Sequence, residues 1–181
     1  MREIEVKACI RDSTRLKRAL RASGIRLGKP VTQHDVVYSP PGAQSGQNVA
    51  WLRIRIENGR RTILTMKRRM GGGAHLDKVE HEVVVSDAGE LANIITHIGY
   101  ELFSDLTKIR RAGHSGDVEI CLDEVLNLGI FIEAERLCSD DADGAAVQTE
   151  LWQLLGTFGI TESDRVTKGY DVLMRQKLGL E

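Results

Sequence analysis

The chain begins with an alternating segment, Glu3-Ile4-Glu5-Val6-Lys7, which strongly constrains how it can fold. Side chains of a β-strand point alternately to opposite faces, so the two glutamates and the lysine share one face and the two apolar residues share the other. Two carboxylates beside one ammonium are groups that bind a divalent cation and a neighbouring anion. An exposed strand with a salt-bridged outer face gives the same pattern, so this segment alone leaves both interpretations open.

The same alternation recurs in later predicted strands, each with one ionic face and one apolar face. The ionic positions are Arg53 and Arg55, Lys67, Lys108 and Arg110, Asp123, and Glu133 and Glu135. Exposed sheet faces normally mix charged residues with Ser, Thr and Gln, which disfavours a solvated face on so many strands. We therefore expect a curled antiparallel sheet in an α+β fold, with helices outside and charges lining its lumen.

Besides the N-terminal strand, seven strands and four helices are expected from periodicity and turn residues. The strands are expected at 34–38, 49–57, 61–68, 79–85, 104–111, 118–123 and 129–137, with an Asn58-Gly59 hairpin turn. The helices are expected after Asp12 or Ser13, after Asp87, around Val147 to Phe158, and from about Thr167 to Leu178. The second helix is expected to bury Leu91, Ile94, Ile95 and Ile98. Residues 39–48 and 70–75 are interpreted as long hairpin loops.

Length and composition narrow the class of protein. A chain of 181 residues with 41% apolar and 28% charged residues is typical of one globular domain, here 1–181, which we expect to consist of two similar halves, about 1–78 and 79–181. The formal net charge of -1 gives no overall attraction to nucleic acid or to a membrane surface. Three widely spaced cysteines and no signal-peptide pattern favour a reducing cytoplasm.

The ionic positions fall into two chemical groups. The acids Glu3, Glu5, Asp123, Glu133 and Glu135 offer the hard oxygen ligands that Mg²⁺ or Mn²⁺ prefers. The bases Lys7, Arg53, Arg55, Lys67, Lys108 and Arg110 offer fixed cations for phosphate oxygens. Acids that hold a metal beside bases that hold phosphate indicate a polyphosphate site.

Short motifs along nearly the whole chain resemble those of a known family. They are Glu3-x-Glu5-x-Lys7 (ExExK), Gln33-x-Asp35, Leu52-Arg53-x-Arg55, Thr65-x-Lys67, Glu80-x-Glu82, Lys108-x-Arg110, Leu122-Asp123-x-Val125, and the stretch from Leu128 to Glu135. In this order they resemble the CYTH proteins, or triphosphate tunnel metalloenzymes, which include class IV adenylyl cyclases and thiamine triphosphatases. The cyclase-like members carry a Ser-Tyr pair before the last helix, where this chain has Lys168-Gly169-Tyr170.

The resemblance implies an eight-stranded antiparallel barrel that binds a triphosphate together with divalent metal ions. Carried over by position, it gives two sets of site residues. The metal ligands would be Glu3, Glu5, Glu133 and Glu135, with Asp123 as a further ligand. The phosphate ligands would be Lys7, Arg53, Arg55, Lys67, Lys108 and Arg110.

Three activities are compatible with these residues. The first is conversion of ATP to cyclic AMP and pyrophosphate, with Glu5 and Glu133 as catalytic acids on Mg²⁺ or Mn²⁺. The second is hydrolysis of inorganic triphosphate or thiamine triphosphate, in which Lys168 would position the attacking water. The third is non-catalytic binding of nucleotides or polyphosphate. The expected partner is thus a small triphosphate, with a homodimer left open.

Overall fold

The sheet contains nine antiparallel strands in the computed structural model, which describes residues 2–44, 47–69 and 78–180. The strands are β1 (Arg2–Ile10), β2 (Val31–Ser39), β3 (Trp51–Glu57), β4 (Arg61–Arg69), β5 (Lys78–Val85), β6 (Glu101–Ser115), β7 (Val118–Val125), β8 (Gly129–Cys138) and β9 (Arg165–Val166). The helices are α1 (Ser13–Ala22), α2 (Ala88–His97), α3 (Gly144–Thr157) and α4 (Tyr170–Lys177), with a 3-10 turn at Glu162–Asp164. The α+β class is therefore confirmed.

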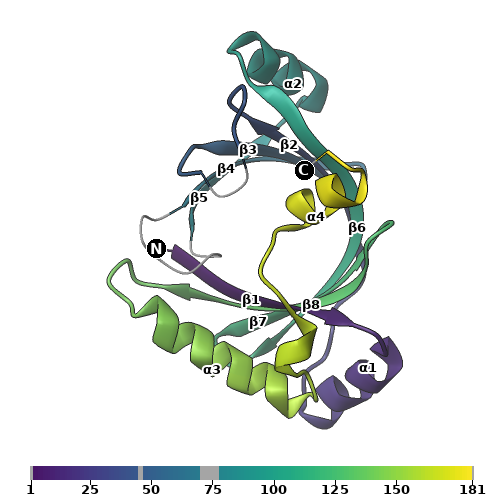
Figure 1. The fold of residues 1–181 in the computed structure, drawn as a ribbon. Coiled ribbons are helices and arrows are strands. Elements are labelled where there is room, and N and C mark those ends of the chain that lie inside the picture. The colour runs from purple at the N-terminus through teal and green to yellow at the C-terminus, as the bar shows by residue number, and fades with distance from the viewer. Residues whose placement is uncertain (1, 45–46, 70–77, 181) are drawn as a thin grey trace.

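The strand order β5-β4-β3-β2-β6-β7-β8-β1-β9 curls until its two sides meet (Figure 1). Among the described residues, one register pair joins β5 to β1, with Glu3 opposite Lys78. Farther along, the same edge of β1 pairs with the two-residue strand β9, where Lys7 lies opposite Val166. The expected eight-stranded barrel is thus corrected to a nine-stranded, barrel-like sheet, in which the described residues form no continuous β5–β1 ladder.

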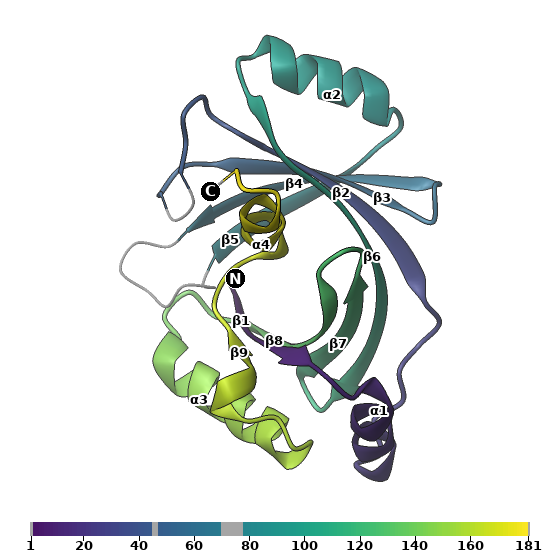
Figure 2. The same ribbon diagram turned by 45° about the vertical axis from the view of Figure 1, so that its right-hand side comes forward.

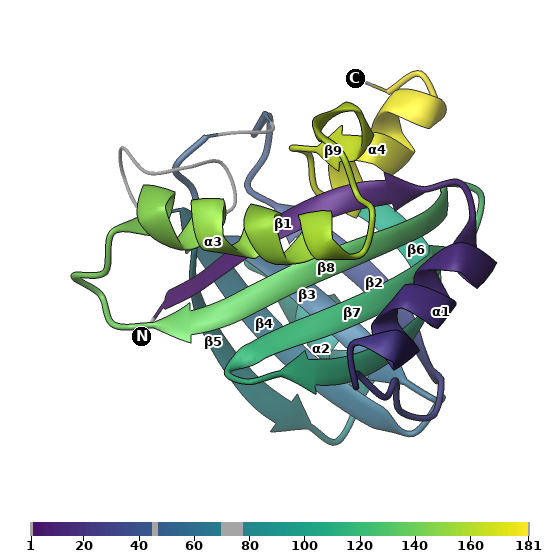
Figure 3. The same ribbon diagram turned by 90° about the horizontal axis from the view of Figure 1, so that it is seen from below.

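One layer of core lies between the sheet and two helices. The apolar face of β1 contributes Ile4, Val6, Ala8 and Ile10, all buried. They pack in one cluster with Leu16 and Leu20 of α1 and with Leu151 and Leu155 of α3. Figure 3 shows α1 and α3 on the outer side of β1, β7 and β8. Burying this face outward directs the ionic face of β1 into the lumen, as the alternation predicts.

The second helix covers the opposite part of the sheet. Ile95 of α2 is buried against Tyr38 of β2 and Ile54 of β3. The expectation that α2 also buries Ile94 and Ile98 is wrong, because these side chains are 50% and 64% exposed. Only one side of α2 lies on the sheet (Figure 2). The apolar face of the helix is wider than this contact, so Ile94 and Ile98 stay exposed to solvent.

The last helix lies over one end of the curled sheet, beside β6 (Figures 1 and 2). It starts at Tyr170, three residues after the expected start, with Gly169 as its N-cap. Tyr170 and Met174 pack with Leu106, Val125 and Phe131 in a small separate cluster. One end of the lumen is therefore covered by α4.

The predicted hairpin turn and the two predicted loops can be compared with the structure. The Asn58-Gly59 turn is confirmed, with left-handed φ values of 49° and 67° and a 2.9 Å hydrogen bond from Arg60 N–H to the Glu57 carbonyl. The 39–48 loop is described except at 45–46, whereas the 70–75 loop lies outside the described residues.

Within the described part of the chain, the helices are too short or too polar to cross a membrane.

Candidate functional site

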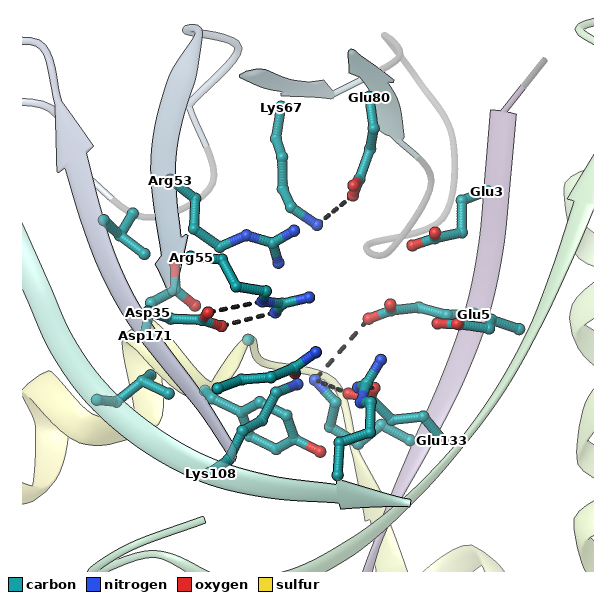
Figure 4. Close-up of a pocket in the computed structure, with 18 of the residues that line it drawn as sticks. Glu3, Glu5, Asp35, Arg53, Arg55, Lys67, Glu80, Lys108, Glu133 and Asp171 are labelled. Carbon is teal, nitrogen blue, oxygen red and sulfur yellow. Dashed lines mark hydrogen bonds and ion pairs between the residues drawn. The ribbon is translucent and has the colours of Figure 1, made fainter. Parts of the chain in front are cut away.

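A cavity of about 750 Å³ occupies the lumen of the curled sheet. This volume is in the range of small-molecule sites, about 300–1,000 Å³. Its lining includes the ionic residues of β1, β3, β4, β6 and β8 together with residues of α4. In Figure 4, Arg53, Arg55 and Lys67 face Glu3 and Glu5 across this space. The structure thus brings all six predicted bases and four of the five predicted acids to the lining of one cavity, whereas Asp123 is not among the described lining residues.

The pair Arg55 and Asp35 anchors the basic side. Nε and Nη2 of Arg55 donate to the two oxygens of Asp35, each at 2.7 Å, and both residues are buried. Burial alone would raise the pKa of Asp35, but the hydrogen bonds from Arg55 and the charge of Arg53 hold that pKa below its ordinary value. Asp35 therefore fixes the Arg55 guanidinium in the wall of the lumen.

A second anchor is Asp123, which is completely buried. It accepts a hydrogen bond of 2.9 Å from Lys108 and two, of 2.8 and 2.6 Å, from Arg110. Burial and the neighbouring Arg110 charge lower the pKa of Lys108. In this structure Asp123 pairs with Lys108 and Arg110, and it does not belong to the two acidic clusters described below.

Nearer the β5 side, two further bases have acidic partners. Lys67 forms an ion pair with Glu80. Arg53 donates to the buried Thr65 at 3.0 Å and to Glu82 at 3.3 Å, and Thr65 itself donates to Glu82 at 2.7 Å. Both acids of the Glu80-x-Glu82 motif therefore contact bases that were predicted to bind phosphate.

The acidic side is centred on Glu135 of β8. Its register neighbours are Glu5 of β1 and Glu119 of β7, since β8 lies between these two strands. Two groups follow from this register, Glu3–Glu5–Glu135 and Glu119–Cys121–Glu135, each with ligand atoms within 4.8 Å of one another. Burial, Glu119 and Glu3 raise the pKa of Glu135 well above its ordinary value.

This spacing fits a divalent cation. Ligand oxygens lie about 2.0–2.6 Å from Mg²⁺ or Ca²⁺, so two oxygens on one ion are at most about 5 Å apart. The carboxylates of Glu3, Glu5 and Glu135 meet that limit. Burial and the neighbouring carboxylates of Glu119 and Glu3 act against the ionised form of Glu135, whose pKa is raised. A bound cation would relieve the repulsion among them.

Lys7 and Glu133 connect the two sides. Lys7 Nζ lies 2.9 Å from Glu133 and 3.8 Å from Glu5. Although burial acts to lower it, the pKa of Lys7 is raised by the Glu133 and Glu5 carboxylates. Burial likewise acts against ionised Glu133, but Lys7 and Arg110 hold its pKa well below the ordinary value. Glu133 is therefore a paired carboxylate, unlike Glu135.

The structure places Lys168 apart from these groups. It is exposed, between β9 and α4, and it is not among the described residues that line the cavity. The next two residues, Gly169 and Tyr170, do line it. Sequence reasoning did not select Glu119, Asp35 or Tyr170 as site residues. For Glu119 the available signal was its shared strand face with Asp123, and for Asp35 it was the Gln33-x-Asp35 motif.

Comparison with known proteins decides the family. The CYTH domain model matches residues 1–170. The chain belongs to the CYTH family. Members of this family process triphosphates and depend on divalent metal, and the acidic clusters of the lumen agree with that chemistry. A relative from Methanocaldococcus jannaschii, named as a candidate adenylate cyclase, is 27% identical over 175 residues, covering 94% of this chain and 97% of its own.

Solved CYTH-like structures support the fold. A Pyrococcus horikoshii protein superposes with a TM-score of 0.81 at 22% identity, covering 94% of this chain and 98% of its own. A candidate adenylyl cyclase from Hippeastrum, described as having a dominant triphosphatase activity, superposes with a TM-score of 0.62 at 14% identity, covering 98% and 95%. At these identities the likeness concerns the fold alone.

Proposed function

We propose that this CYTH protein is a divalent-metal-dependent enzyme that acts on a triphosphate bound in the lumen. The observation that carries the proposal is the meeting of two opposite chemistries in one 750 Å³ cavity. Carboxylates spaced for one cation lie across the cavity from fixed guanidinium and ammonium groups. A metal-bound polyphosphate needs both, since cations neutralise its oxygens and carboxylates hold its metal.

The roles of the chain's own residues follow from their partners. Arg53, Arg55 and Lys67 are proposed to hold the phosphate oxygens from one side, and Lys7, Lys108 and Arg110 from the α4 end. The proposed metal ligands are Glu3, Glu5, Glu133 and Glu135. Asp123, expected as a further ligand, is not proposed as one, because it is buried outside the described cavity lining with both oxygens bonded to Lys108 and Arg110. Bound Mg²⁺ or Mn²⁺ would supply positive charge at the reacting phosphate and acidify a bound hydroxyl. Asp35 and Asp123 keep the cations oriented before the substrate arrives.

Our first choice of reaction is adenylyl cyclisation, which is supported by the name of the M. jannaschii relative. In it, the ribose 3′-hydroxyl gives up its proton to solvent water, and its oxygen forms a bond to the α-phosphorus of ATP. The bond from that phosphorus to the bridging oxygen breaks, and pyrophosphate leaves toward the bases. Glu5 and Glu133 are proposed as the acids nearest this exchange, because they share Lys7 between them.

Hydrolysis is the second candidate, favoured by the triphosphatase activity described for the Hippeastrum neighbour. Water then replaces the ribose hydroxyl as the attacking group, and inorganic triphosphate or thiamine triphosphate replaces ATP. Lys168 was expected to position that water, and its exposed place outside the cavity lining means that a shift of its segment would be required.

The three cysteines are unpaired, which fits our proposal of a cytoplasmic location.

One experiment separates these reactions. The protein is incubated with ATP, inorganic triphosphate or thiamine triphosphate, each with Mg²⁺ or Mn²⁺, and the products are identified by chromatography. Cyclic AMP and pyrophosphate from ATP are expected. Release of orthophosphate from inorganic triphosphate much faster than pyrophosphate from ATP would instead establish the hydrolase. No product from any of the three would reduce the proposal to binding alone.

A further inference from the structure

An aromatic ring at the α4 end of the cavity contacts two of the proposed phosphate-binding cations. Tyr170 is buried and lines the cavity. Lys7 Nζ lies 3.9 Å from the centroid of its ring, and Lys108 Nζ lies 5.0 Å from it. Both distances are within the range of about 6 Å over which an ammonium is attracted to an aromatic face.

The Tyr170 ring also packs against a second aromatic ring. The ring of Phe131 meets it edge-on, with centroids 5.0 Å apart and planes at 62°. Its helix is also connected to the strand that carries Lys7, because Val166 in β9 lies opposite Lys7 in β1. Tyr170 follows Val166 by four residues. The backbone that pairs with Lys7 therefore leads directly into the helix that carries the ring.

The other partners of Lys7 are acids that the proposed metal would engage. Lys7 Nζ contacts Glu133 at 2.9 Å and Glu5 at 3.8 Å. A divalent cation competes with the ammonium for these carboxylate oxygens. The neutral Tyr170 ring does not ligate a hard cation, so its attraction to Lys7 persists when the metal binds.

We propose that Tyr170 is a positioning residue, which holds the Lys7 ammonium, and less closely that of Lys108, at the place where a triphosphate oxygen binds. This inference rests on the proposed function and adds to it a residue that touches the phosphate-binding groups from the covered end of the lumen. It gives α4 a role in phosphate binding in addition to its packing on β6. Tyr170 serves here through its π face, so phenylalanine should replace it and an aliphatic residue should not.

The first test measures the ring–ammonium contact without substrate or metal. In protein labelled with [¹³C]lysine, the Lys7 Hε signals are assigned by their loss in Lys7→Met. Protons over an aromatic face are shifted upfield, so we expect an upfield Lys7 signal in the unaltered protein and in Tyr170→Phe. In Tyr170→Leu the signal should return to the ordinary lysine position. An unshifted Lys7 signal in the unaltered protein would overturn the proposal.

The second test measures binding of inorganic triphosphate with Mg²⁺ by calorimetry. We expect Tyr170→Leu to weaken binding about tenfold and Tyr170→Phe by less than about threefold. In a Lys7→Met background, Tyr170→Leu should cause little further loss, because its effect acts mainly through that ammonium. Met174→Ala is the matched control, since Met174 packs in the same cluster on α4 and is expected to change affinity by less than about threefold.

Two results of the binding test would contradict a positioning role. One is an equal loss in Tyr170→Phe and Tyr170→Leu, and the other is an undiminished loss in the Lys7→Met background. Failure of the unaltered protein to bind triphosphate at all would overturn the proposed function and the phosphate-binding role of Tyr170 with it. The lysine spectrum would then still show whether the ring–ammonium contact exists, so the two failures are distinguishable.

Discussion

Arg55 and Asp35 are joined by two hydrogen bonds of 2.7 Å inside the lumen, where both side chains are shielded from water. Removing one member of such a pair leaves the other charge buried without compensation. We expect Asp35→Asn to lower the free energy of unfolding by about 3 kcal/mol, as measured by urea denaturation. His34→Ala is the control on the same strand, because His34 pairs with an exposed Asp105 and should change stability by less than about 1 kcal/mol. Equal effects of the two substitutions would contradict the anchoring role of Asp35.

The same pair predicts a pH dependence. The pKa of Asp35 is lower in the folded protein than in the unfolded chain, so the unfolded chain binds more protons between the two values and stability rises with pH there. The contribution is complete above the ordinary pKa of about 4 and is lost as the pH falls from there toward the folded-state value. The difference in unfolding free energy between the unaltered protein and Asp35→Asn should therefore shrink as the pH is lowered below about 4. A difference that stays constant down to pH 3 would rule this out.

Glu133 and Glu135 lie two residues apart on β8 and should respond oppositely to neutralisation. Glu133 is paired with Lys7 and Arg110, so Glu133→Gln in metal-free protein should lower the free energy of unfolding by about 3 kcal/mol. Glu135 lies beside other carboxylates, so Glu135→Gln should raise it by about 1 kcal/mol. Thermal and urea unfolding in EDTA measure both. Shifts of the same sign in the two variants would show that the acidic side is not divided in this way.

Glu5→Gln tests the metal site directly. It removes one of three carboxylates whose oxygens lie within 4.8 Å of one another, so turnover should fall at least about a hundredfold and the Mg²⁺ requirement should rise. The measurement is the product assay with ATP and with inorganic triphosphate over a range of Mg²⁺ concentrations. Near-normal, metal-dependent turnover by Glu5→Gln would remove this group from the proposed site.

Strand alternation predicted the ionic lumen because period two is a local property of the chain. Ile4 and Val6 had to face one way and Glu3, Glu5 and Lys7 the other, and the structure confirms both faces. Alternation does not set which strands become neighbours. The position of Glu119 beside Glu135 depends on the β7–β8 register, and for that reason Glu119 was not selected from the sequence.

The sequence pattern also did not predict which charged side chains form ion pairs with one another. All five acids share the ionic face, yet Asp123 is enclosed by Lys108 and Arg110, whereas Glu135 lies among carboxylates. Repulsion among the lumen carboxylates is therefore confined to the group around Glu135. The division into two similar halves stays a prediction, as do the catalytic roles assigned to Glu5, Glu133 and Lys168.

Binding of inorganic triphosphate by calorimetry, with Mg²⁺ and with EDTA, tests most directly whether the lumen is a metal-triphosphate site. We predict binding that requires Mg²⁺ and that Arg53→Ala weakens by about 2 kcal/mol, because Arg53 lines the cavity as a partly desolvated cation. Arg18→Ala, an exposed arginine on α1, should leave the affinity unchanged. Equal affinities of these two variants, or equal binding with and without Mg²⁺, would contradict the placement of the substrate in the lumen.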